Sequence, residues 1–123
     1  MRTAYLIGAA ALALSSTAAS AQAVGDWVLA RWRGEAFWFP GVIQARIGGQ
    51  VTIRYDDGTL ETRPLSQVRP YDWQVGTAVT CRWTDGRWYP AAIVALARGG
   101  LTIRVRYSDG VFQTTQTGRC REE

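Results

Sequence analysis

After its first residues, this chain of 123 residues is written twice. The sequence that begins at Val24 restarts at Val75, and RYDDG at 54–58 returns as RYSDG at 106–110. Matching positions stay 50 to 52 residues apart, a register that chance similarity would not hold over this length. The two copies must therefore share one fold, and each has only about 50 residues in which to form it.

Within each copy, short strand-like stretches are separated by turn sequences. In DWVLARW, alternation directs Leu29 to one side of a strand and Val28 and Ala30 to the other. The DDG and SDG sequences favour tight hairpins, because glycine adopts positive φ without steric cost. No amphipathic pattern of helical period lasts long enough for a helix. The strands predicted in the first copy are 26–32, 38–47, 48–55, 59–65 and 67–71, with counterparts in the second copy.

These strands predict an all-β fold, with two small five-stranded barrels in tandem after a cleaved signal peptide. Closure into a barrel removes the exposed edges that short antiparallel strands would otherwise present. We place the first barrel at 24–73 and the second at 74–123. No flexible linker separates them, so we expect the barrels to pack against each other, with Tyr71 and Trp73 in the contact.

The first 23 residues have the layout of a secretory signal peptide. A short positive start at Arg2 is followed by an apolar run of small residues, and ASAQA offers cleavage after Ala21 or Ala23. The alternative is a transmembrane anchor, but the run is short and diluted by alanine and serine. We therefore expect a mature protein of about 100 residues, periplasmic or secreted, with no membrane span.

The composition argues against catalysis. The chain has no histidine, which removes the usual general base and the commonest metal ligand. Asp56 and Asp57 are adjacent in a hairpin, so their side chains diverge instead of converging on a substrate. No nucleophile motif, phosphate-binding glycine loop or metal-ligand spacing occurs. We expect no enzymatic activity, no catalytic residue, no metal and no cofactor.

The charge is mildly basic, with a formal net charge of +4 and fourteen basic residues, all arginine. Arginines interleaved with aromatics, as in IRVRY, suit nucleic acids or anionic polymers. Arginines at alternate strand positions, such as Arg104 and Arg106, are equally explained as a solvated sheet face. Export argues against a nucleic-acid partner and leaves an anionic envelope polymer open.

The order of motifs resembles the Tudor and Agenet branch of the SH3-like barrels. Three motifs follow one another as in that family: VLARW at 28–32, an aromatic-proline pair at 39–40 and YDDG at 55–58. The second copy repeats this order. The resemblance covers nearly the whole chain after the signal peptide. It implies aromatic pockets that receive a methylated lysine or arginine side chain.

Carried over residue by residue, the resemblance implies one ligand-binding pocket in each barrel. The place of a further cage aromatic is taken by Thr59 and Val111, so both cages are incomplete. The alternative for the aromatic residues is that they only fill the small cores of the barrels. The alternative for Asp57 and Asp109 is that they only stabilise the turns in which they lie. The candidate ligand-binding residues are Trp32, Phe39, Tyr55 and Asp57 in the first barrel and Trp83, Tyr89, Tyr107 and Asp109 in the second.

The two cysteines predict a disulfide in an exported chain. Cys81 lies in the first strand of the second barrel and Cys120 in the last, and these strands are neighbours in an SH3-like barrel. Ala30 and Val68 are their counterparts in the first copy.

Two residues of the aromatic-proline region remain to be placed. Trp38 and Trp88 each precede the aromatic-proline pair by one residue and so face the opposite way from its aromatic ring. We expect them either in a barrel core or on the surface as exposed apolar spots.

The function predicted is that of a secreted, non-catalytic binding module for a protein or peptide with a cationic or methylated side chain. The alternative is a structural protein of the cell envelope that associates with anionic polymers or with itself.

Overall fold

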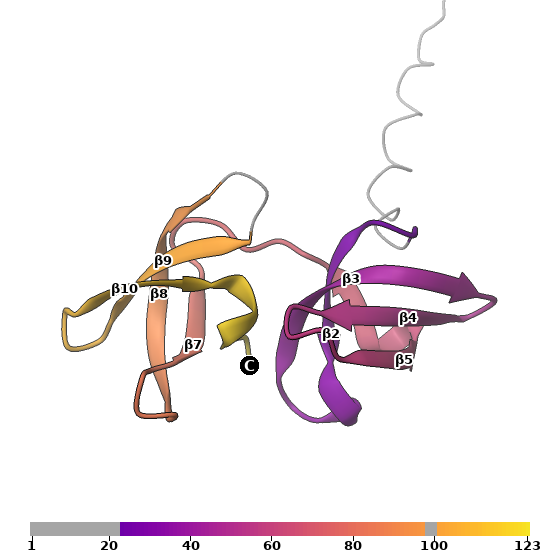
Figure 1. The fold of residues 1–123 in the computed structure, drawn as a ribbon, viewed down its shortest axis with the longest axis horizontal. Coiled ribbons are helices and arrows are strands. Elements are labelled where there is room, and N and C mark those ends of the chain that lie inside the picture. Colours follow the sequence, from indigo (N-terminus) through magenta and orange to yellow (C-terminus); the bar gives the residue numbers. More distant parts are fainter. Residues whose placement is uncertain (1–22, 98–100) are drawn as a thin grey trace, which may run out of the picture.

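Two antiparallel sheets of five strands lie side by side in the computed structural model, which describes residues 23–97 and 101–123 (Figure 1). The first sheet has the order β5-β4-β3-β2-β6 and the second the order β10-β9-β8-β7-β11, so corresponding strands occupy corresponding places. The predicted all-β, tandem-barrel fold is confirmed. The predicted signal peptide lies outside the described residues, except for Ala23. The strands are β2 Trp27–Arg31, β3 Trp38–Ile47, β4 Gln50–Tyr55, β5 Leu60–Pro64 and β6 Val68–Pro70, then β7 Ala78–Arg82, β8 Trp88–Leu96, β9 Thr102–Tyr107, β10 Phe112–Gln116 and β11 Cys120–Arg121.

Helical structure in the described part of the chain is limited to three 3-10 turns, which the sequence did not predict. η3 Leu65–Gln67 and η4 Thr117–Arg119 occupy corresponding places, because each connects the fourth strand of its sheet to the fifth. η2 Trp32–Gly34 follows β2 and contains Arg33, a non-glycine residue at positive φ (54°). η3 and η4 each lead into the last strand of a sheet, which pairs with the first strand of the same sheet.

Strand alternation decides which residues form the core of the first sheet. Val28 and Ala30 are fully buried and pack with Ile43 and Ile53. Leu29 lies on the opposite face of β2 and is also fully buried, because it packs into the core cluster of the second sheet. The predicted alternation is confirmed, and its outward face serves as the contact between the two barrels.

A disulfide joins Cys81 to Cys120, as predicted, with a Cα–Cα distance of 4.1 Å. The two residues face each other in the pairing of β7 with β11. In the first sheet, Ala30 and Val68 face each other in the same way between β2 and β6. The disulfide therefore replaces an apolar contact at an equivalent position.

The segment between the sheets is packed against the second barrel. Trp73 is 4% exposed and belongs to the same core cluster as Val79 and Leu29. Its indole nitrogen donates a hydrogen bond of 2.8 Å to the Glu122 carboxylate near the C-terminus, which lies between the two sheets in Figure 1. Tyr71 is half-buried and its ring lies 5.5 Å from that of Trp73. The predicted place of both aromatics, in the contact between the barrels, is confirmed.

Trp38 lies in neither of the two predicted environments. It is half-buried in the contact between the barrels, where its backbone pairs with Glu122 and its ring lies 5.0 Å from the Arg31 guanidinium and 4.6 Å from that of Arg69. The expectation of a barrel core or an exposed apolar spot was wrong, because it considered each barrel alone.

Trp88 lies in the same contact from the other side. Its ring centroid is 6.0 Å from that of Phe39 in the first sheet. The Arg121 guanidinium lies 4.0 Å from the Trp88 ring and 3.6 Å from the ring of Phe37. By stacking on these aromatic rings, Arg121 connects β11 to the segment just before β3.

Candidate functional site

A cavity of about 370 Å³ opens between the β7–β8 and β9–β10 hairpins of the second barrel. All four residues that the resemblance predicted for this barrel line it. We call this pocket the second-barrel cage; it is lined by Trp83, Asp85, Tyr89, Pro90, Tyr107, Ser108, Asp109 and Val111.

The rings of the second-barrel cage meet at nearly right angles. The ring centroids of Trp83 and Tyr107 are 5.4 Å apart with an interplanar angle of 84°, and those of Tyr89 and Tyr107 are 6.4 Å apart at 87°. Tyr107 is 6% exposed and Tyr89 is 36% exposed. The pocket is thus formed by one buried ring with two more accessible rings set nearly perpendicular to it.

Hydrogen bonds hold two of these rings in place. Tyr107 donates from its hydroxyl to the side-chain oxygen of Gln113, which lies in β10. Tyr89 donates to Oδ2 of Asp85 over 2.6 Å, and Asp85 in turn accepts the backbone N–H of Arg87 through Oδ1. The hydroxyls are therefore directed toward neighbouring strands and turns, which leaves the ring surfaces to shape the pocket.

Asp85 is a pocket residue that sequence reasoning missed. The hydrogen bond from Tyr89 lowers the pKa of the Asp85 carboxyl, so this group is ionised at neutral pH. The signal that could have found it is the sequence TDG at 84–86, which repeats the hairpin chemistry of SDG at 108–110. The YxDG motif of the resemblance includes the SDG turn and not the TDG turn.

The carboxylates predicted from the YxDG motifs shape their turns and line the pockets at the same time. Asp109 accepts the backbone N–H of Val111 over 3.0 Å, and Asp57 accepts that of Thr59 over 2.9 Å. The backbone N–H of Thr59 lowers the pKa of Asp57. The two alternatives considered for these residues, turn former and pocket rim, are therefore not exclusive.

The first barrel contributes to a cavity of another kind, with a volume of about 330 Å³. The rings of Trp32 and Tyr55 meet here as their counterparts do, with centroids 5.5 Å apart at 86°. The second barrel supplies much of the remaining wall. We call this pocket the inter-barrel cleft; it is lined by Trp32, Phe39, Pro40, Tyr55, Asp56, Asp57 and Thr59 from the first barrel and Arg82, Trp88, Gly118 and Arg119 from the second.

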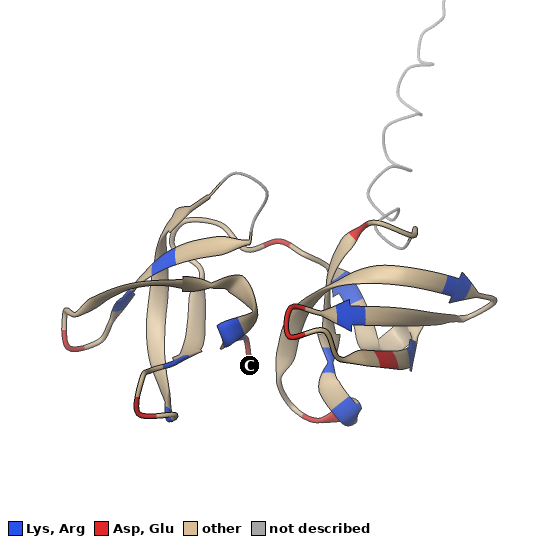
Figure 2. Ribbon diagram, in the orientation of Figure 1, with Lys and Arg blue, Asp and Glu red and all other residues tan. Residues whose placement is uncertain are grey.

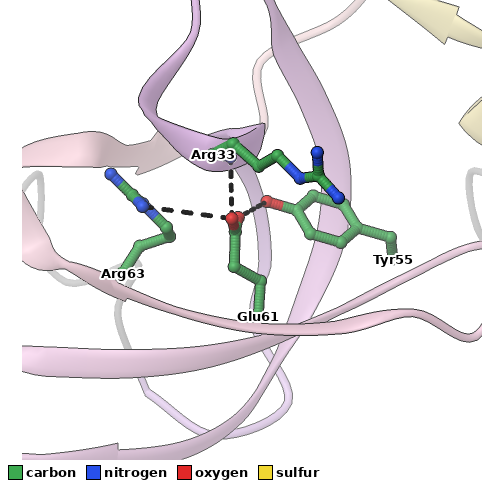
Figure 3. A network of polar contacts seen from close by, with 4 residues as sticks. All are labelled: Arg33, Tyr55, Glu61 and Arg63. Atoms are coloured by element: carbon green, nitrogen blue, oxygen red, sulfur yellow. Dashed lines mark hydrogen bonds and ion pairs between the residues drawn. The ribbon is translucent and has the colours of Figure 1, made fainter.

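A polar network holds Tyr55 in the inter-barrel cleft (Figure 3). Its hydroxyl donates to Oε1 of Glu61 over 2.9 Å, while Oε2 accepts the backbone N–H of Arg33 over 2.7 Å and lies 3.9 Å from the Arg63 guanidinium. Burial, together with the Glu61 carboxylate, raises the pKa of Tyr55. The Arg33 guanidinium lies 5.3 Å from the Trp32 ring, so a cation of the protein itself already contacts this aromatic residue.

The charges of the two pockets differ. The residues lining the second-barrel cage include two carboxylates, Asp85 and Asp109, and no basic side chain, although Arg87 lies beside the cage on the β7–β8 hairpin. The inter-barrel cleft has two carboxylates and two arginines, Arg82 and Arg119. Because like charges repel, the second-barrel cage is the better of the two for a cationic guest.

Among residues 23–97 and 101–123, no group of three or more histidine, cysteine, aspartate or glutamate side chains is placed to hold a metal ion. No helix within these ranges is long and apolar enough to cross a bilayer.

Comparison of sequences finds a short match. No profile of a known protein family matches the chain. A stretch of 43 residues, 35% of the chain, is 44% identical to PHD finger protein 20-like protein 1 of Mus musculus, and the protein of that name in Rattus norvegicus matches equally. The match spans only 4% of the length of these relatives.

Comparison of structures covers most of the chain. The crystal structure of the Crb2 tandem tudor domains superposes with a TM-score of 0.61, over 80% of this chain and 78% of that one, at 15% identity. The ADCP1 tandem Agenet domain 3-4 aligns over 88% of this chain and 84% of that one at 16% identity, but its TM-score of 0.39 is too low to carry an argument. The likeness to Crb2, together with the two five-stranded sheets, shows that the chain has a tandem Tudor-type fold.

Proposed function

We propose that this protein is a non-catalytic binding module and that its second-barrel cage receives a methylated lysine or arginine side chain of a protein partner. The observation that carries the proposal is the joint presence of three aromatic rings and two carboxylates around one open cavity, from Trp83, Asp85, Tyr89, Tyr107 and Asp109. The tandem Tudor-type fold supports it, since the resemblance to Tudor domains implies such ligands.

The chemistry of the cage fits a methylated cation. Aromatic faces attract a cation through the ring quadrupole, and each such contact contributes about 0.5 to 2 kcal/mol. Methyl groups spread the charge over an apolar surface that suits the rings, and the carboxylates add charge complementarity. Val111 takes the place of a further ring, so one wall is aliphatic and affinity for an isolated side chain is modest.

The test is titration of the purified protein, followed by tryptophan fluorescence, with peptides that carry unmodified, dimethylated or trimethylated lysine and with peptides that carry unmodified or dimethylated arginine. Trp83→Ala and Tyr89→Ala should each weaken binding of the methylated peptides by about tenfold. Trp83 also packs against the core of the second barrel, whereas Tyr89 is more than one-third exposed. Tyr89→Ala therefore separates loss of the cage from loss of the fold, which circular dichroism checks.

The control for this test is Trp32→Ala, in the first barrel. Trp32→Ala removes the corresponding aromatic residue of the inter-barrel cleft and should leave the affinity largely unchanged, provided that circular dichroism shows a folded protein. If methylated and unmodified peptides bind the wild type equally, or if none binds, the proposed function is wrong.

We infer that the protein acts after export. The arrangement of residues 1–23 supports this, and so does the Cys81–Cys120 disulfide, because such bonds persist in oxidising compartments. Expression with its own leader, followed by N-terminal sequencing of the exported protein, should find Val24 or Gln22 as the first residue. Recovery of the unprocessed chain from the cytoplasm alone would contradict export.

A further inference from the structure

Two arginines stack on an exposed phenylalanine on the outer face of the second barrel. Phe112 in β10 is 48% exposed and faces Arg106 across the pairing with β9. The Arg106 guanidinium lies 6.0 Å from the Phe112 ring, and that of Arg104, two residues earlier in β9, lies 4.7 Å from it. We call these three residues the arginine–phenylalanine cluster.

The cluster is a cationic surface, because the charges of its two arginines are not neutralised by ion pairs within the described residues. Both arginine side chains are exposed, and neither has an ion pair with a carboxylate of the described residues. Figure 2 shows basic residues on the strands of this barrel and acidic ones at the tips of its hairpins. Stacking on an aromatic face restricts a guanidinium and leaves its N–H groups free to bind a carboxylate bidentately.

The first barrel does not repeat this surface. The positions that correspond to Arg104, Arg106 and Phe112 are Thr52, Arg54 and Leu60. Only one arginine and no aromatic ring stand there. The cluster therefore belongs to the barrel that also carries the more favourable cage.

The cluster adjoins the second-barrel cage. Arg106 and Phe112 are sequence neighbours of the cage residues Tyr107 and Val111, but strand alternation places Arg106 on the face of β9 opposite to Tyr107. The Arg106 guanidinium reaches toward the β9–β10 turn at the rim of the cage, where a Cβ added at Gly110 would lie 3.8 Å from its Nη2. A peptide whose cationic side chain enters the cage would reach this cluster where the peptide continues over the β9–β10 turn.

We propose that the partner of the second-barrel cage is a peptide segment in which acidic residues flank the cationic one, and that the arginine–phenylalanine cluster binds those acidic residues. The inference rests on the proposed function and adds the sequence around the modified residue. A peptide fits better than a nucleic acid, because it can place its cation beside the carboxylates of Asp85 and Asp109 and its acidic residues beside the arginines, whereas a nucleic-acid backbone offers only negative charge to both surfaces.

The experiment compares three peptides of equal length with a central trimethyl-lysine, flanked on both sides by glutamate, by glutamine or by lysine. We expect the glutamate peptide to bind the wild type about three- to tenfold more tightly than the glutamine peptide, and the lysine peptide to bind more weakly than both. The preference for glutamate should shrink as salt is raised, because exposed ion pairs are screened.

Variants assign the preference to the cluster. Arg104→Gln combined with Arg106→Gln should abolish the preference for glutamate while leaving the affinity for the glutamine peptide unchanged. Arg54→Gln, at the position of the first barrel that corresponds to Arg106, is the matched control and should preserve the preference.

The outcomes separate this inference from the proposed function. If the glutamate and glutamine peptides bind the wild type equally, the acidic flank is refuted and the cage proposal stands. If no trimethylated peptide binds, both are refuted. If single-stranded oligothymidine binds the wild type through Arg104 and Arg106 and displaces the glutamate peptide, while Tyr89→Ala binds it undiminished, the cluster is a nucleic-acid surface and the inference is overturned.

Discussion

Trp73 and Glu122 are 49 residues apart in sequence, and the Trp73 indole donates a 2.8 Å hydrogen bond to the Glu122 carboxylate. The same carboxylate lies 2.8 Å from the Arg69 guanidinium, at the end of the first sheet. Since the backbone of Glu122 also pairs with Trp38 in β3, one residue near the C-terminus connects the first barrel, the connecting segment and the second barrel. The two barrels are thereby joined in a single packed unit.

Glu122→Ala should lower the free energy of unfolding by about 1 to 3 kcal/mol, because it leaves the largely buried Trp73 N–H without its acceptor and removes the ion pair with Arg69. Urea denaturation followed by circular dichroism measures the change. Glu123→Ala, which alters an exposed neighbouring carboxylate, is the control and should change stability by less than about 0.5 kcal/mol. Equal stability of the two variants would contradict the role given to Glu122.

Reduction of the Cys81–Cys120 disulfide should lower the free energy of unfolding by about 4 kcal/mol in the chain-entropy account, since the bond closes a loop with a sequence separation of 39. Urea denaturation with and without a reductant measures this. The variant Cys81→Ala with Cys120→Val reproduces the Ala30 and Val68 pair of the first barrel and should fold without responding to reductant. Two free thiols in unfolded, non-reduced exported protein would show that no disulfide had formed.

Asp56 and Asp57 should have opposite effects on stability as pH changes. Burial raises the pKa of Asp56 above its ordinary 3.8, so its ionisation opposes folding at neutral pH and this penalty disappears as pH falls through the raised pKa. The pKa of Asp57 is lowered by the backbone N–H of Thr59, so its stabilising effect is complete above pH 3.8 and is lost as pH falls through the lowered pKa.

The two asparagine variants test these opposite signs. At pH 7, Asp56→Asn should be more stable than the wild type and Asp57→Asn less stable, and both differences should decline between pH 6 and pH 2. Chemical denaturation across this range gives the free energies. Differences of the same sign for the two variants would refute this assignment.

Gly118 should tolerate no side chain while Asp56 keeps its place. A Cβ added at Gly118 would lie 2.3 Å from the Asp56 Cβ, so one barrel must shift relative to the other. Gly118→Ala should therefore cost about 1 to 3 kcal/mol in unfolding free energy, as overpacking does. Gly49→Ala is the control, because no atom lies within 4 Å of the added Cβ. Thermal unfolding compares the two, and a Gly118→Ala variant as stable as the control would show that the barrels do not meet at this point.

Much of the fold could be predicted because its signals are local. The strand predicted at 38–47 coincides with β3 Trp38–Ile47, since an aromatic-proline start and a Gly-Gly turn bound it. The disulfide followed from the presence of two cysteines in a chain expected to be exported and from the pairing of the first and last strands that the resemblance to SH3-like barrels implies. The 3-10 turns could not be predicted in this way, because three residues such as Leu65–Gln67 are too few to show a helical period.

The contact between the barrels could be predicted only in outline. Tyr71 and Trp73 indicated it because large apolar residues stand at the junction of the two copies, where no flexible linker separates them. The full burial of Leu29 and the positions of Trp38 and Trp88 depend on how one sheet docks on the other, which alternation within a strand does not encode. For the same reason, no local pattern predicted Arg119 in the inter-barrel cleft.

Most residues of the second-barrel cage that carry chemistry could be named from the sequence, and one depends on the three-dimensional structure. Trp83, Tyr89, Tyr107 and Asp109 could be named from the order of motifs, and all four line one cavity. For Asp85, the TDG sequence at 84–86 indicates only a carboxylate in a hairpin turn, since its place in the cavity depends on the geometry of the β7–β8 turn and on its hydrogen bond with Tyr89.

The most direct test of the central claim compares trimethyl-lysine with its neutral isostere, in which carbon replaces the quaternary nitrogen. The shape and apolar surface are conserved and only the charge is lost. Isothermal titration of the purified protein with two otherwise identical peptides should give an affinity about tenfold higher for the charged one, since the second-barrel cage attracts a cation through its rings and carboxylates. Equal affinities would show that no cation is recognised and would contradict the account.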